Sequence, residues 1–197
     1  MRNSASLSNA FDSISSSITS SIGGAAHRKE REYRPEHGNA WKDEAGWPKP
    51  ESAQRLESTG GQERWEDVTV RLRPNPFAQG GQRNAYHMQL ISVGGKRLGT
   101  AEHAVHCVAK ESRYEGEDSE RLSTLKAEME ETRLATELAV RFNREVGQKG
   151  TEITVVPCQV YRLPLPHGAG FRYMSVEQFL PGTFVKHNGT YSAKYFS

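Results

Sequence analysis

The pattern of hydrophobic and polar positions separates an N-terminal third without strand-like alternation from a remainder that carries clear elements. Val68, Val70 and Leu72 alternate with polar residues, which is typical of a strand with one buried face. Later apolar runs of strand length are bounded by glycine or proline, and they predict further strands. The predicted strands cover residues 67–72, 83–93, 103–112, 152–163 and 171–180.

One long helix is predicted between the third and the fourth of these strands. Apolar side chains in residues 118–146 recur near the 3.6-residue period, and Gly147 stands where a helix C-cap is expected. The order along the chain is therefore three strands, one helix and two strands. It predicts an α+β fold in which a curved antiparallel sheet packs against a single long helix.

Residues 1–26 form a segment of a different kind. They are rich in serine, which competes for backbone hydrogen bonds and disfavours a helix in water, so we expect a disordered tail. The alternative is an amphipathic helix that makes weak contact with a membrane or a partner through residues 7–22. One apolar stripe at helical spacing supports this alternative: Leu7, Phe11, Ile14, Ile18 and Ile22.

Residues 27–65 are interpreted as a polar linker, because charged residues, proline and glycine interrupt every period. Tryptophan is unusual in a disordered linker. We therefore expect some of Trp41, Trp47 and Trp65 to dock on the domain that follows. That domain is predicted to span residues 66–197.

Composition narrows the classes of function. The 197 residues carry a formal net charge of +2, which by itself points to no nucleic-acid partner. No apolar run approaches the roughly 20 residues that a membrane-spanning helix needs. Two cysteines are too few for a disulfide framework, and the N-terminus lacks the apolar region of a secretory signal. We therefore expect an intracellular, cytoplasmic protein.

A glycine pair between two predicted strands is the first candidate for chemistry. Gly80 and Gly81 are followed by Gln82 and Arg83. Glycine lets backbone N–H groups approach an anion closely, and the Arg83 guanidinium offers a fork of donors to phosphate. A simple tight turn is the alternative, and turn statistics favour it for this motif taken alone.

The third predicted strand offers a lysine near its end, in the run Val108-Ala109-Lys110. Such a lysine can lie at a sheet edge with its ammonium group in water. It can also hold nucleotide phosphates if a carboxylate orients it. The predicted helix supplies four candidates for that carboxylate: Glu128, Glu130, Glu131 and Glu137.

The last predicted strand runs into Pro181-Gly182. A strand that ends in this way is typical of the hinge between two lobes, where backbone groups recognise the edge of an adenine. A buried strand that ends in an ordinary turn is the alternative.

Together these motifs resemble the beginning of the atypical alpha-kinase domain, the family of myosin heavy chain kinases, elongation factor 2 kinase and channel-linked kinases. The resemblance covers residues 66–190, with His187 where the family usually has tyrosine. The matching segments are Phe77-x-x-Gly80-x-x-Arg83-x-Ala85, Val108-Ala109-Lys110, Leu138-Ala139-x-x-Phe142-Asn143 and Glu177-x-Phe179-Leu180-x-Gly182-x-Phe184-x-Lys186-x-Asn188.

The resemblance implies a site for ATP. Arg83 and Lys110 would hold the nucleotide, with Glu128 as the partner of Lys110. The hairpin over the phosphates would consist of Gly80, Gly81 and Gln82. The adenine site would be lined, largely through backbone atoms, by Glu177, Gln178 and Phe179.

The family's C-terminal lobe brings a catalytic Asp, an Asp-x-Gln-Gly metal-binding segment and a His/Cys zinc site. No Asp follows Asp118, and the sequence ends at Ser197. We therefore expect only the N-terminal lobe of an alpha-type Ser/Thr protein kinase, weakly active or inactive alone, with no catalytic or metal-binding residue. Mg²⁺ would accompany ATP in a complete domain, and a protein substrate is implied but not identified. The alternative is a non-catalytic pseudokinase or adaptor fragment that binds a protein partner.

Overall fold

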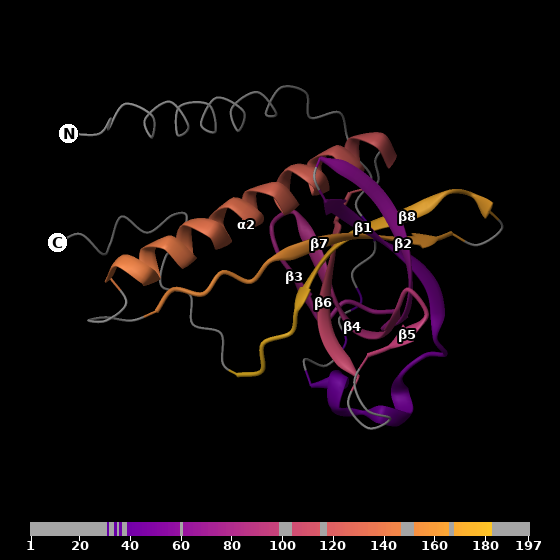
Figure 1. Cartoon of the computed structure of the whole chain (residues 1–197). Coiled ribbons are helices and arrows are strands. Elements are labelled where there is room, and N and C mark those ends of the chain that lie inside the picture. Colours follow the sequence, from indigo (N-terminus) through magenta and orange to yellow (C-terminus); the bar gives the residue numbers. More distant parts are fainter. Residues whose placement is uncertain are drawn as a thin grey trace, which may run out of the picture.

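The computed structural model describes residues 31, 34, 36, 39–59, 61–98, 104–114, 118–146, 152–165 and 168–182, the side chains of residues 118–120 excepted. The serine-rich segment 1–26 and the hinge motif from Phe184 onward lie outside these residues. Figure 1 shows the described elements. In chain order they are two 3-10 helices, strands and one α-helix: η2 (Ala40–Lys42), η3 (Glu44–Gly46), β1 (Glu51–Thr59), β2 (Gln62–Leu72), β3 (Ala78–Gln79), β4 (Arg83–Val93), β5 (Lys96–Arg97), β6 (Val105–Ser112), α2 (Asp118–Val146), β7 (Cys158–Pro164) and β8 (Phe171–Gln178).

The strands form one antiparallel sheet that curves until it closes. The order of neighbours is β2-β1-β7-β8-β6-β4-β3, and β2 pairs with β4 as well. That last pairing runs from Val68 opposite Val93 to Leu72 opposite Met88, with a register shift between Thr69 and Val70. Such a bulge increases the local bend and twist of a strand. Six strands therefore close into a barrel, and the two short strands β3 and β5 lie beside β4.

The inside of the barrel is filled by the inward-pointing side chains of alternate residues. Val70, Met88, Ala109 and Met174 are completely buried there, and Tyr161 is 1% exposed. Alternation along each strand sends every second side chain to the opposite, outer face. Charged and polar groups can therefore gather on the outside of the same strands that build the core.

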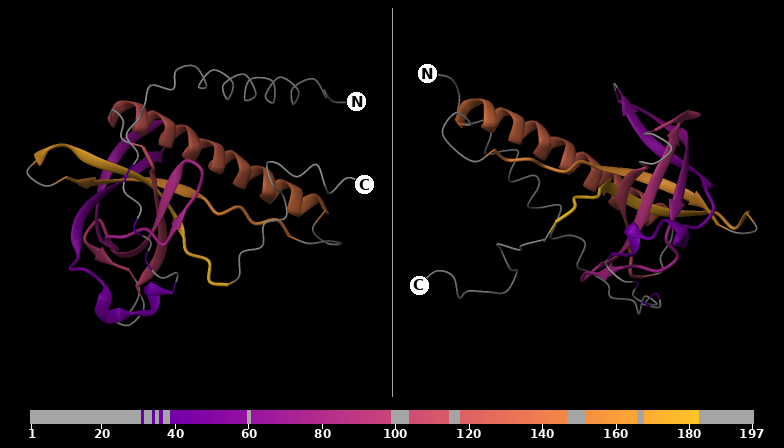
Figure 2. Two further views of the ribbon diagram at one scale, coloured as in Figure 1. Left: turned by 180° about the vertical axis from the view of Figure 1, so that it is seen from behind. Right: turned by 90° about the horizontal axis from the view of Figure 1, so that it is seen from below.

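The helix α2 packs on the outer face of the barrel. Leu125 lies in a second apolar cluster with Leu56 of β1, Val160 of β7 and Tyr173 of β8. Figure 2 shows the C-terminal half of α2 running past the edge of the sheet. The Asn143 side chain at that end bonds the backbone N–H and C=O of Ile153, at 2.9 and 2.7 Å. These two bonds hold residues 152–157 against the helix end.

The fold confirms the predicted antiparallel sheet with one long helix. The observed bounds of α2 and β4 match the predicted 118–146 and 83–93. Within the described residues, no helix has both the length and the apolar composition that a bilayer crossing requires.

The predicted linker 27–65 is wrong in its second half, which forms β1 and the beginning of β2. Only Ala53 and Leu56 of β1 are buried, so this strand has little apolar alternation to reveal it. The predicted strand 152–163 also begins too early, because Cys158 is its first paired residue. Pro157 precedes it and has no N–H with which to extend the ladder.

Candidate functional site

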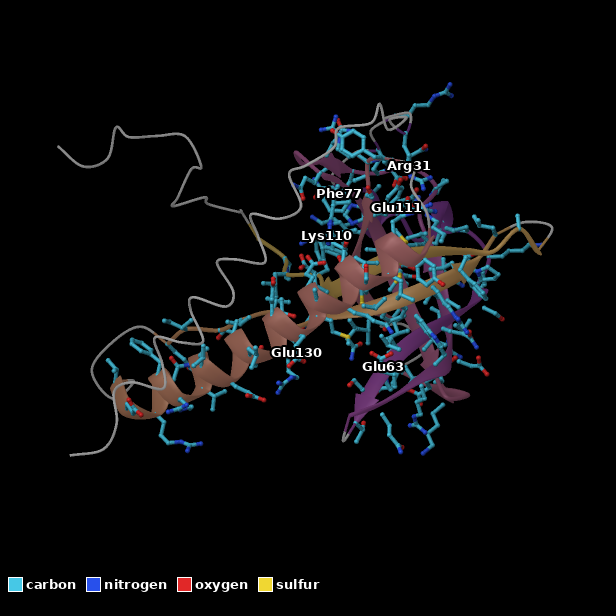
Figure 3. The ribbon with its side chains drawn as sticks, turned by 90° about the horizontal axis from the view of Figure 1, so that it is seen from above. Arg31, Glu63, Phe77, Lys110, Glu111 and Glu130 are labelled. Carbon is cyan, nitrogen blue, oxygen red and sulfur yellow. The ribbon has the colours of Figure 1, made fainter. Side chains whose placement is uncertain are left out.

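Lys110 lies on the outer face of the barrel, on β6. Its register partners are Ala85 on β4 and Ser175 on β8. The Nζ atom lies 2.6 Å from Glu177 Oε1, and the two side chains are 34% and 28% exposed. The ammonium group is therefore held by a carboxylate and still accessible from solvent. Figure 3 shows Lys110 and Phe77 on one side of α2, with Glu63 on the other.

Arg83 lies next to Lys110 on the same face. It is the first residue of β4, two positions from Ala85, which is opposite Lys110. Its Nη1 donates to Glu128 Oε2 at 2.5 Å and to Ser175 Oγ at 2.8 Å. Arg83 thus joins three elements, since Glu128 belongs to α2 and Ser175 to β8.

The structure pairs these groups differently from the sequence prediction, which assigned Glu128 to Lys110. Glu128 contacts Arg83, and Lys110 contacts Glu177. Glu177 is two residues beyond Ser175, the register partner of Lys110, so its side chain emerges diagonally across the two strands. The partner of Lys110 thus lies on β8 and not on the helix, and the sequence does not reveal it because β6 and β8 become neighbours only in the folded barrel.

The glycine hairpin is fixed from outside by Arg113. The Arg113 backbone N–H donates to Gln82 O at 2.9 Å, and its Nη1 donates to the carbonyls of Gly80 and Gly81 at 3.0 and 3.2 Å. Neither glycine has a positive φ. An added Cβ on Gly81 would meet nothing within 4 Å, and one on Gly80 only Arg83 O at 3.7 Å. The fold itself therefore does not require glycine at either position. The Gly80 N–H donates to Arg83 O at 2.8 Å, which closes the hairpin as a tight turn.

The end of β8 carries the predicted hinge. Gln178 is opposite Cys107, and the Phe179 N–H donates to His106 O at 3.0 Å. The Phe179 ring approaches the His87 ring edge-on, with centroids 5.7 Å apart. His87 in turn stacks on Phe77 at 3.9 Å, just ahead of the glycine hairpin. Aromatic contacts therefore join the residue after β8 to Phe77, just ahead of the hairpin.

Two of these residues were missed by sequence reasoning. Ser175 holds Arg83, and His87 lies between Phe77 and Phe179. The alternation of β8 places Ser175 on the same face as Glu177. Ser175 could therefore have been predicted if the pairing of β6 with β8 had been known. His87 is 1% exposed, and a single histidine in an apolar strand gives no such signal.

A buried carboxylate supports the strand of Lys110 from the other side. Glu111 is 1% exposed, lies 3.2 Å from Arg31 Nη2 and accepts a bond from Arg172 Nη2 at 2.8 Å. The Arg31 backbone N–H also donates to Arg113 O at 2.7 Å. This triad ties β6 and β8 to Arg31, and Figure 3 shows Glu111 and Arg31 next to each other. Arg113, which accepts the bond from Arg31, is the residue that holds the glycine hairpin.

Metal ligands do not gather anywhere in the described part of the chain: no three or more His, Cys, Asp or Glu side chains lie close enough to hold an ion. The two described cysteines are buried and unpaired with each other. The candidate site is therefore a pair of accessible cations beside a glycine hairpin and the end of β8.

Comparison with known proteins identifies relatives of this chain. The model of the Alpha-kinase family matches residues 78–195. The curated "Alpha-protein kinase vwkA" of Dictyostelium discoideum is 26% identical over 121 residues, which is 61% of this chain and 18% of that protein. The chain thus spans less than a fifth of this relative.

Solved structures share the fold. The alpha-kinase domain of myosin heavy chain kinase A in complex with AMPPCP has a TM-score of 0.58 and 19% identity, over 74% of this chain and 66% of that one. The alpha-kinase domain of myosin-II heavy chain kinase A in complex with AMP-PNP has a TM-score of 0.54 and 19% identity, over 72% and 65%.

Proposed function

The chain belongs to the alpha-kinase family, and from this we propose that its barrel binds ATP on the outer face, between the glycine hairpin, α2 and the end of β8. The observation that carries the proposal is the adjacent pair Arg83 and Lys110, each held by its own carboxylate and each accessible. The similar domains bound to AMPPCP and AMP-PNP support the choice of ligand.

The two cations would hold the phosphates. Arg83 uses Nη1 for both Glu128 and Ser175, and a guanidinium has five N–H donors, so it can add a phosphate without losing these contacts. Lys110 has three donors and can likewise bind Glu177 and a phosphate oxygen together. The carboxylates therefore act as orienting partners. The backbone of Gly80, Gly81 and Gln82 would cover the phosphates.

The adenine would lie against the hinge. Gln178 has a register partner on one side only, Cys107, and would offer backbone groups to the base edge. Glu177 is paired on both sides, with Val108 and Cys158, so it would line the site through its side chain. The Phe179 N–H is already bonded to His106 O, so Phe179 would contribute its ring and its carbonyl group. Val108 is on the same outer face as Lys110 and is 9% exposed, which supplies apolar surface beneath the base.

The reaction implied by the family is transfer of a phosphoryl group from ATP to a protein Ser or Thr. This transfer depends on bound Mg²⁺ and on a residue that positions the nucleophile. The residues that the structure describes include no cluster of His, Cys, Asp or Glu side chains that could hold a metal ion. What this chain's own residues would do is bind and orient the nucleotide.

Calorimetric titration with AMP-PNP tests the proposal. We expect Arg83→Ala and Lys110→Ala each to weaken binding at least about tenfold, since a charge-assisted bond to phosphate is lost. Lys126→Ala is the matched control: Lys126 is also 34% exposed and paired with a glutamate, Glu63, away from the site. Equal losses in Lys110→Ala and Lys126→Ala would refute the site. A wild-type chain that binds no nucleotide would favour the pseudokinase or adaptor alternative.

A further inference from the structure

Residues 39–47, here called the strap, cross the outside of the barrel before β1 begins. They form η2 and η3 and lie outside the segment 78–195 that the family model matches. Their side chains include Trp41 and Trp47, of which Trp47 is 8% exposed. The strap is therefore packed on the barrel, although the family model does not include it.

A single buried guanidinium anchors the strap. The Arg73 side chain is 5% exposed, and it donates to Ala40 O at 2.5 Å, Asp43 O at 2.8 Å and Gly46 O at 2.6 Å. It also lies 4.7 Å from the centroid of the Trp47 ring. Hydrogen bonds from one buried cation to three backbone carbonyls fix the course of the strap. None of these three bonds involves a flexible surface side chain.

Gly46 packs too closely against the Arg73 guanidinium to leave room for a side chain. A Cβ on this residue would lie 2.5 Å from Arg73 Nη1 and 2.3 Å from Asp43 Oδ2. The Asp43 side chain can move, but Arg73 is held by three carbonyls. A methyl group at residue 46 would therefore displace the strap without touching the hinge itself.

The strap places Trp41 against the hinge. The Trp41 ring lies 5.1 Å from the Phe179 ring and 5.4 Å from the His106 ring. These are the two residues joined by the bond from Phe179 N–H to His106 O. Trp41 therefore packs over the connection between β6 and the end of β8, at the start of the aromatic series Phe179, His87 and Phe77.

We infer that Trp41 is a positioning residue for the hinge: through Phe179 it sets the surface against which the adenine binds, so that base recognition depends on the docked strap. This inference rests on the proposed ATP site. The ring contacts of Trp41 are with His106 and Phe179, at the base end of the proposed site. The strap should therefore affect binding of the base, whereas Arg83 and Lys110 affect binding of the phosphates.

Two variants test this in the full chain. Trp41→Ala removes the contact, and Gly46→Ala displaces the strap with Trp41 intact. Without nucleotide, we expect both variants to speed hydrogen exchange of the Phe179 amide about tenfold. We expect both to weaken AMP-PNP binding about fivefold, which is the loss expected for an aromatic contact. Binding of inorganic tripolyphosphate should stay the same, and Trp41→Phe should restore most of the AMP-PNP affinity. Trp65→Ala, which removes a tryptophan that packs beside Tyr173, is the control.

The outcomes are distinct. Unchanged Phe179 exchange in both variants overturns the inference, as does an equal loss of tripolyphosphate and AMP-PNP binding, which would indicate a general loss of structure. If the wild-type chain binds no AMP-PNP, the proposed function fails, and the positioning of Phe179 by Trp41 is then decided by amide exchange alone.

Discussion

The Arg83 guanidinium lies 2.5 Å from the Glu128 carboxylate, and this ion pair ties α2 to the strand that leaves the glycine hairpin. Arg83 and Glu128 are 45 residues apart in the chain, and their contact makes the direction of the Arg83 side chain depend on the position of the helix. Any movement of α2 along the barrel would therefore change the orientation of the Arg83 guanidinium in the proposed nucleotide site.

A double-mutant cycle on Arg83 and Glu128 measures this dependence. The side chains are 24% and 32% exposed, so solvent screening limits the coupling free energy of unfolding to about 0.5–1 kcal/mol. We expect Glu128→Gln to weaken AMP-PNP binding less than Arg83→Ala does, because Arg83 remains but is less well oriented. Urea denaturation and calorimetry measure the two effects, with Glu131→Gln on the same helix as the control. Additive single-variant effects would show that the pair is not coupled.

Glu111 is expected to matter for stability far more than its neighbours on the surface. Its carboxylate is 1% exposed and contacts both Arg31 and Arg172. Glu111→Gln leaves two cations facing a neutral amide, and we expect a loss of about 2 kcal/mol in the free energy of unfolding. Glu130→Gln, an exposed pair with Arg133 on α2, should cause no measurable loss. Equal midpoints for the two variants in urea would contradict a structural role for the triad.

Arg73→Leu should release the strap. The substitution removes the donor of three backbone carbonyls while keeping an apolar stem, and we expect a loss of about 2–4 kcal/mol in the free energy of unfolding. Limited proteolysis should then cut within residues 39–47 while the barrel stays intact. Arg97→Leu, at an exposed strand residue, is the control. A strap that remains protease-resistant in Arg73→Leu would show that other contacts hold it.

The packing around His106 predicts an acid-sensitive strap. Burial lowers the pKa of His106 below its usual value, and the Glu44 carboxylate of the strap partly opposes this. The folded state therefore favours the neutral ring. The stability gained by burying the neutral His106 ring is complete above the pKa of histidine in the unfolded chain, about 6.5. It is lost as pH falls from there through the lower pKa of His106 in the folded protein.

Thermal midpoints between pH 7.5 and 5 measure this loss. We expect Glu44→Gln to lose stability more steeply on acidification than the wild type, since it lacks the carboxylate that favours the protonated ring. His106→Asn should show a flatter profile over the same interval. Parallel profiles for all three chains would show that another group is responsible for the acid sensitivity.

The two buried cysteines should resist alkylation in the folded protein. Burial raises the pKa of Cys107 to about 11, and burial also raises the pKa of Cys158. The reactive thiolate is therefore scarce at pH 8, and the sulfur atoms are shielded from reagent. We expect no modification by iodoacetamide at pH 8 in buffer and modification of both in urea, measured by mass spectrometry. Rapid labelling of either residue in buffer would mean that the barrel opens locally.

Elements that are marked by a pattern among neighbouring residues could be predicted from the sequence, and elements that depend on pairing with distant segments could not. α2 was predicted with its observed bounds because a helix repeats its apolar contacts every three to four residues, which a sequence displays directly. β4 was predicted from a run of strand length between two turns, which is also visible in neighbouring residues. β1 was missed, because a strand with two buried side chains owes its place to pairing with β2 and β7.

The sequence by itself determined the long helix, the main strands and the family motifs with the cations Arg83 and Lys110. Only the tertiary structure decided which carboxylate faces each cation, that β2 closes the barrel on β4, and that Trp41 lies on Phe179. The physical reason is that helical and strand periods are set by neighbouring residues, whereas an ion pair or a ring contact depends on chain segments that meet only when the sheet closes.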